Sequence, residues 1–171
     1  EAKPNAAAAD DSIRYSICRI AFDAEQHTFG SKTDTIYNAM TQGGSASFPR
    51  ISPDGRWLCF TLSEYGNFSI CHRDADLQNG NKLTRLDAAN DSKNVVSFHS
   101  WSRNSRWLVF SGKRDNSIYT KPYFTHIDTG GKPSKPFVLP QQNAKNTYDL
   151  EMDCYNLPEL VDGKITVGKI E

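Results

Sequence analysis

A histidine and a basic loop are the residues in this sequence with the clearest capacity for chemistry. The residues that could contact a ligand or partner are His99, Lys113, Arg114, Asp115, Tyr119 and Arg50. His99 stands two positions before Trp101, and an imidazole can exchange a proton near neutral pH. The loop 112–117, GKRDNS, could bind an anionic or polar ligand. The simpler alternatives are that His99 caps the backbone of a neighbouring element and that the loop is a solvated turn with a local ion pair.

Complete catalytic or metal-binding motifs are missing from the sequence. It contains no G-x-S-x-G, no H-E-x-x-H, no glycine-rich phosphate loop and no calcium loop. The histidines, His27, His72, His99 and His126, are scattered, and the cysteines do not follow metal-ligand spacing. We therefore expect no catalytic residue, no metal and no cofactor.

An acidic stretch, YDLEMDCY, has Asp149, Glu151 and Asp153 at every second position. In a strand these carboxylates would share one face, which could hold a cation. A solvated tail is the simpler interpretation.

Composition narrows the classes of partner. The 171 residues include 20 Lys and Arg against 20 Asp and Glu, so the formal net charge is zero. This balance argues against nucleic acid as the main partner. No apolar run approaches the ~20 residues that span a bilayer. Residues 1–12 have no signal-peptide pattern, and we expect a flexible lead-in to a chain cut from a longer protein.

The elements that must position these residues come from an internal repeat. The run SFPRISPDGRWLCF, 47–60, matches SFHSWSRNSRWLVF, 97–110, without a gap. The offset of 50 residues is in the range of repeat architectures. Trp57 and Trp107 are equivalent in the repeat, so we expect both to pack between repeat units.

A tight turn lies inside each copy of the repeat. In the first copy Ser52, Pro53, Asp54 and Gly55 should reverse the chain between a strand ending at Ile51 and one starting at Trp57. Asp54 is expected to bond the turn backbone rather than act in catalysis. In the second copy we expect Asn104 to take the strained conformation of Gly55.

Each copy divides into four short strands. The first copy gives strands around 46–51, 57–62, 68–73 and 82–86, and the run WLCFTL is apolar on both faces, so both should be covered. We predict an all-β fold of four-stranded antiparallel β-propeller blades. Residues 13–40 form a partial blade, 46–87 and 95–140 form whole blades, and 144–171 form a tail with a possible closing strand. About two and a half blades cannot close a ring, so we expect a fragment of a larger propeller.

Strand register bears on the cysteines. If Ser63 faces Phe68 across the turn, Phe60 faces Cys71 and Cys59 points to the other face. A Cys59–Cys71 disulfide is then excluded, and we expect buried thiols without disulfides.

The first copy resembles the TolB-type propeller repeat, P-x-x-SPDG-x-x-[apolar]-x-F-x-S/T. The matching residues are Pro49, Ser52, Pro53, Asp54, Gly55, Leu58, Phe60 and Thr61. The second copy departs from it at the Pro, Asp and Gly positions, and the wider resemblance, over 13–143, is to uncharacterised TolB-like envelope proteins of Gram-negative bacteria. The resemblance implies a periplasmic or envelope-associated propeller, and the same scaffold hosts binding and hydrolytic roles.

Three functions fit these observations. The first is a noncatalytic module that binds a protein or glycan in the envelope. The second is part of a propeller lyase or hydrolase acting on a saccharide or peptide, with His99 and Arg114 at the channel mouth. The third is an assembly scaffold. Uncovered blade faces would also favour a dimer.

Overall fold

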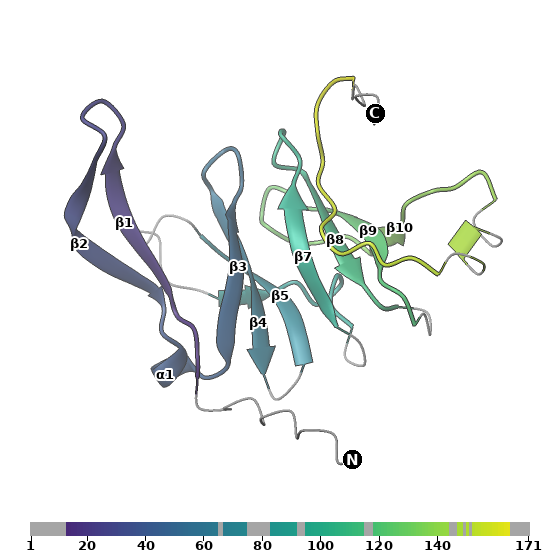
Figure 1. The fold of residues 1–171 in the computed structure, drawn as a ribbon, viewed down its shortest axis with the longest axis horizontal. Helices are drawn as coiled ribbons and strands as arrows, with labels where there is room; N and C mark the ends of the chain where they lie inside the picture. Colours follow the sequence, from purple (N-terminus) through teal and green to yellow (C-terminus); the bar gives the residue numbers. More distant parts are fainter. Residues whose placement is uncertain are drawn as a thin grey trace, which may run out of the picture.

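Three antiparallel sheets lie side by side along the molecule (Figure 1). The computed structural model describes residues 13–64, 67–74 (backbone only), 83–91, 95–114, 118–143, 147–148, 150 and 152–164. The elements are β1 Ile17–Asp23, β2 Thr28–Tyr37, α1 Ala39–Gln42, β3 Ser45–Ile51, β4 Trp57–Glu64, β5 Asn67–Asp74, β6 Leu83–Arg85, β7 Val96–Trp101, β8 Trp107–Gly112, β9 Lys121–His126 and β10 Phe137–Val138.

The two copies of the repeat fold into two sheets with the same strand order. One sheet runs β3-β4-β5-β6 and the other runs β7-β8-β9-β10, each with its strands in sequence order. The pair β1-β2 forms a separate two-stranded sheet. The all-β class is confirmed, with two four-stranded blades and a partial one, as in part of a propeller.

The two turns of the repeat are built alike. In the first, the Ser52 hydroxyl donates to Asp54 Oδ1 (2.6 Å) and accepts from the Trp57 N–H (2.9 Å). Ser102, Asn104 and Trp107 repeat this arrangement in the second copy. Sequential strands can therefore follow each other after a five-residue turn in both copies.

The strained residue of the second turn is not the expected one. Gly55 has φ 75, as predicted, but Ser105 rather than Asn104 takes the left-handed conformation, with φ 58. Asn104 instead takes over the bonds of Asp54, because its side-chain oxygen accepts from the Arg106 N–H (3.1 Å). The prediction for Asn104 was wrong, since its amide is used inside the turn.

The apolar core is split between the two faces of the β3–β6 sheet. Alternate residues of β4 point to opposite faces, so Trp57 and Cys59 join the core shared with β7–β9, whereas Phe60 joins the core shared with β1 and β2. The register Phe60↔Cys71 and Ser63↔Phe68 is as predicted, and it excludes a Cys59–Cys71 bridge. Cys59 is buried, whereas Cys18 and Cys154 are exposed, contrary to the expected burial of the thiols.

The two repeat-related tryptophans have different surroundings. Trp57 is 8% exposed between the two sheets, as predicted. Trp107 is 36% exposed and packs edge-on against His126 and Phe137 of its own sheet. The prediction that Trp107 packs between blades was wrong, because the chain places no further sheet over that face in its described part.

Each first strand carries a bulge at an aromatic residue. The pairing shifts between Ser47 and Arg50 in β3 and between Ser97 and Ser100 in β7. Phe48 and Phe98 have φ 52 and φ 54, and their ring centroids lie 4.8 Å apart. These bulges turn the side chains that follow them towards the space between β3 and β7.

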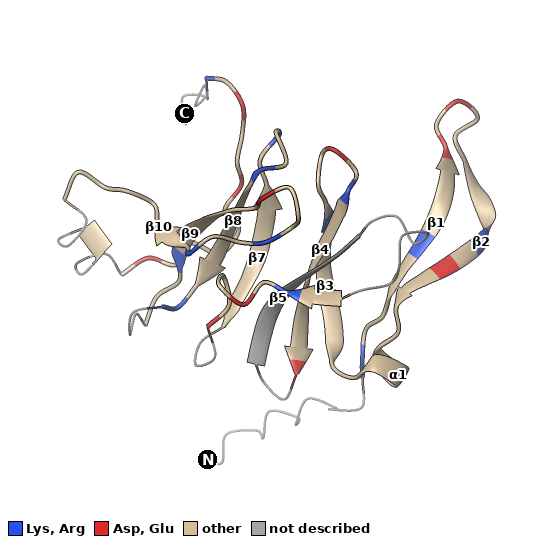
Figure 2. Cartoon of the chain, turned by 180° about the vertical axis from the view of Figure 1, so that it is seen from behind, with Lys and Arg blue, Asp and Glu red and all other residues tan. Residues whose placement is uncertain are grey.

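In the part of the chain that the structure describes, no helix has the length and apolar character needed to cross a membrane. Basic and acidic residues are interspersed along the sheets and loops (Figure 2), in keeping with the balanced net charge.

Candidate functional site

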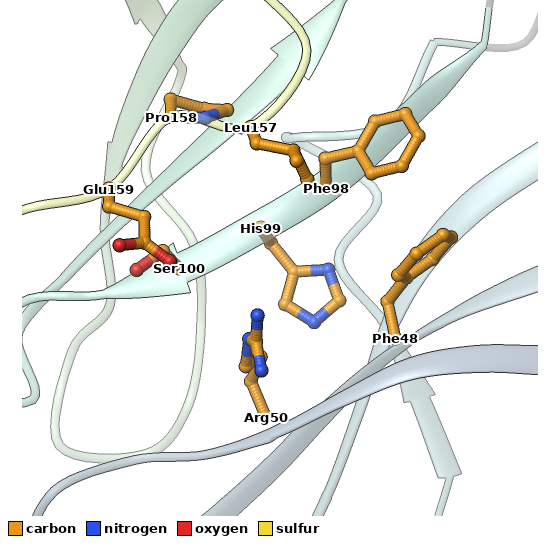
Figure 3. Close-up of a pocket in the computed structure, with 8 residues that line it drawn as sticks. All are labelled: Phe48, Arg50, Phe98, His99, Ser100, Leu157, Pro158 and Glu159. Atoms are coloured by element: carbon orange, nitrogen blue, oxygen red, sulfur yellow. The ribbon is translucent and has the colours of Figure 1, made fainter.

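A small pocket opens where β3 meets β7, and we call it the junction pocket (Figure 3). Its lining residues are Phe48, Arg50, Phe98, His99, Ser100, Leu157, Pro158 and Glu159. Its volume is about 20 Å³, enough for one water-sized group. The pocket unites two of the predicted contact residues, His99 and Arg50, with a tail segment that sequence reasoning left out.

His99 has an unusual environment for a polar side chain. It follows the bulge of β7, is 3% exposed, and points towards β3 between Arg50 and Phe48 (Figure 3). Neither Nδ1 nor Nε2 has a hydrogen-bond partner among the described residues. Buried polar groups are nearly always hydrogen-bonded, so this exception needs an explanation.

Burial is the main cause that lowers the pKa of His99 to about 4. The backbone groups of Cys59 and Phe48 favour the charged form, although they do not lie in hydrogen-bonding geometry with the ring. The positive charge of Arg50 opposes that form. At neutral pH the ring is therefore uncharged, with one N–H donor and one acceptor nitrogen.

Arg50 supplies the positive charge of the pocket. Its backbone carbonyl accepts a hydrogen bond from Trp101 Nε1 (3.3 Å), which ties β3 to β7. Its side chain is exposed and makes no ion pair in the described chain. The guanidinium is therefore available to a ligand while the backbone of the same residue holds the junction together.

The tail closes one side of the pocket. The Ser111 hydroxyl donates to the Tyr155 carbonyl, and the Tyr155 N–H donates to the Thr120 carbonyl (3.1 Å). Further along, Arg103 forms an ion pair with Asp162 (3.5 Å). These contacts hold the segment 157–159 beside β7 (Figure 1), and its lack of apolar periodicity explains why sequence reasoning missed it.

The basic loop lies elsewhere. Arg114 donates to the carbonyl of Ala89 (2.7 Å) and its guanidinium lies over the Tyr123 ring at 5.7 Å. Lys113 follows β8 and bonds Val95 through its backbone (3.3 Å). The structure thus gives Arg114 a packing role and does not place it with His99.

The remaining predicted contact within the described residues, Tyr119, does not line the pocket. Tyr119 is half-buried ahead of β9. Asp115 and the acidic positions Asp149 and Glu151 lie outside the described residues.

The turn residues of the first copy are structural. The Ser52 hydroxyl is the main cause that lowers the pKa of Asp54, and the Asp54 N–H donates to the Ser105 hydroxyl across the junction (2.9 Å). The Asp54 carboxylate accepts from the Arg56 N–H (3.1 Å), so its side chain bonds the turn backbone while its own N–H links the two turns.

Two titratable side chains, those of His99 and Glu159, line the pocket. No hydrogen bond joins them in the described residues. Among the described residues no cluster of His, Cys, Asp and Glu could hold a metal ion.

No protein-family model matches the chain, and no curated protein is similar to it in sequence. Solved structures are similar to it in fold. A TolB from Agrobacterium tumefaciens is 18% identical, with a TM-score of 0.45, over 72% of this chain and 44% of that protein. The β-propeller domain of the Trilobed protease from Pyrococcus furiosus, described as having an open velcro topology, is 19% identical, with a TM-score of 0.44, over 74% of this chain and 36% of that one.

A TolB from Acinetobacter baumannii is 18% identical, with a TM-score of 0.42, over 70% of this chain and 29% of that protein. The chain thus spans less than half of the length of each of these structures. TolB structures and a protease propeller domain are both similar to it. This is the TolB-like resemblance that the SPDG-type repeat predicted.

Proposed function

We propose that the chain is part of a noncatalytic binding module of the bacterial cell envelope, and that it binds a protein or glycan partner at the junction pocket. The observation that carries the proposal is His99, a buried imidazole without a hydrogen-bond partner in the described chain. It lines a pocket with Arg50, whose guanidinium makes no ion pair among the described residues. Leaving such a group without a partner costs about 1–3 kcal/mol, and a bound partner would recover it.

The envelope location rests on the resemblance of the SPDG turn and its flanking residues to the TolB-type repeat. A binding role agrees with the separation of His99 from Arg114, since the enzymatic alternative needed both at one site. The domain limits 13–40, 46–87, 95–140 and 144–171 are part of the proposal, and the dimer through uncovered faces stays a prediction.

Site-specific photo-crosslinking tests the proposal. A photoreactive phenylalanine analogue at Leu157, which is exposed and lines the pocket, should crosslink to a partner in envelope extracts. The same analogue at Met152, exposed on the same segment but outside the pocket, should not. Equal labelling from both positions would show that the pocket is not the binding site.

A further inference from the structure

The junction pocket combines three polar side chains from two blades. Arg50 comes from β3, and His99 and Ser100 come from β7. The guanidinium is a permanent cation, and the neutral imidazole offers one N–H donor. A ligand group that satisfies both must be negative and must accept hydrogen bonds.

A carboxylate has these properties. One oxygen can pair with the guanidinium of Arg50 while the other accepts from the N–H of His99. A cationic ligand would be repelled by Arg50, and a neutral carbonyl would leave the guanidinium without a partner. The charge of Arg50 and the N–H donor of His99 together therefore favour an acidic ligand group.

The size of the pocket limits how much of an acidic ligand can enter it. At about 20 Å³ the pocket holds one water-sized group, so at most one oxygen of the acid enters it and the stem lies outside. Two aromatic rings line the pocket beside its charged residues, Phe48, which is 44% exposed, and Phe98, which is half-buried. An aliphatic stem can pack on these rings, as in an acidic side chain of a peptide.

The chain itself places a peptide at this mouth. The segment Leu157-Pro158-Glu159 lines the pocket, so an apolar residue, a proline and an acid lie beside Arg50 and His99 (Figure 3). Glu159 makes no ion pair with Arg50, although both side chains line the same pocket. The segment shows that polypeptide fits against the rim.

We propose that the junction pocket recognises an acidic side chain of a partner peptide, with Arg50 as the cation and His99 as the uncharged hydrogen-bond donor. The inference rests on the proposed function and names its ligand class.

Peptide titration tests this inference on the whole chain carrying Glu159→Gln, which removes the internal acid. The probe is a blocked peptide of sequence NLPEL, that of residues 156–160, and its control is NLPQL. NLPEL should bind about tenfold or more tightly than NLPQL, because a charged hydrogen-bonded pair is lost in the control. Adding Arg50→Gln should abolish that difference, while Arg106→Gln, a change at an exposed arginine outside the pocket, should keep it.

Nuclear magnetic resonance of the histidine rings gives an independent readout. NLPEL should raise the pKa of His99 above about 4, because a nearby negative charge favours the imidazolium, and NLPQL should not. The readout needs no change at His99, so it does not depend on a variant that folds poorly.

The outcomes separate the inference from the proposed function. Equal affinity for the two peptides, or an unchanged preference in Arg50→Gln, would overturn the acidic ligand while leaving a binding module in place. Crosslinking of a partner from Leu157 without any binding of NLPEL would do the same. Loss of the pocket-specific crosslink would instead overturn the proposed function.

Discussion

Repeat-related residues at the junction between the two blades and on their outer faces differ in burial. Trp101 is 8% exposed against β3, whereas its equivalent Ile51 is 61% exposed on the side of the partial blade. Trp57 is buried against the second blade, and its equivalent Trp107 lies on an open face. Both residues of each pair are apolar, so residue type does not decide their burial. A neighbouring blade does, as expected for repeats that bury their faces only against each other.

The largest effect should come from removing the two tryptophans separately. Trp57→Ala should lower the free energy of unfolding by about 3–5 kcal/mol, because it opens a cavity between blades. Trp107→Ala should cost less than half as much, since part of that ring already contacts water. Urea denaturation measures both values. Equal losses would mean that another surface covers Trp107 in solution.

The pH dependence of stability should distinguish His99 from its repeat equivalent, Pro49, which cannot titrate. The pKa of His99 falls from 6.5 to about 4 on folding, so the unfolded chain takes up a proton first as the pH drops. The stabilisation is therefore fully present above pH 6.5 and is lost as the pH falls towards 4, by about 3 kcal/mol at most.

Denaturation of the wild type and of His99→Gln between pH 4 and 7 measures this pH-dependent loss of stability. The wild type should lose more stability than the variant over that range. Direct titration of the His99 ring covers the case in which the variant does not fold. A ring pKa near 6.5 would contradict the buried, uncharged state.

A smaller loss of stability is expected from substitutions at Ser105, the residue of the second turn that bonds the first. Ser105→Ala should cost about 1–2 kcal/mol, because the Asp54 N–H loses its acceptor. Ser105→Gly should cost about 1 kcal/mol less than Ser105→Ala, because glycine relieves the positive φ. Melting temperatures give the order of the two variants. If the glycine variant were the less stable one, the left-handed assignment would be wrong.

The sequence predicted the parts of the fold that depend on local chemistry. The SPDG turn and the apolar run after it placed β3 and β4, and the turn length between β4 and β5 predicted the Phe60↔Cys71 register. These features depend on a few adjacent residues, so they could be predicted from the sequence. The repeat offset pointed to Ser105 as the equivalent of Gly55, but residue preference favoured Asn104.

The candidate site was only half predictable. His99 and Arg50 could be named from their strands, but their meeting depends on two bulges and on how the blades pack. The tail segment 157–159 has no repeat equivalent and no periodic pattern to predict its position. The exposure of Trp107 could not be predicted either, because it depends on whether another sheet covers that face. The residues next to Trp107 in the sequence do not determine this.

The hydrogen bonds across the junction also shape the order of folding. They join Asp54 to Ser105, Arg50 to Trp101, Thr61 to Ser97 and Arg56 to Thr129, at separations of 51, 51, 36 and 73 residues. Closing a loop ten times longer than a hairpin turn costs about 2 kcal/mol more in chain entropy. Strands within a blade can therefore pair before the blades dock, and the docking step carries the high contact order that slows folding. A φ-value analysis of hairpin and junction residues would read this order directly.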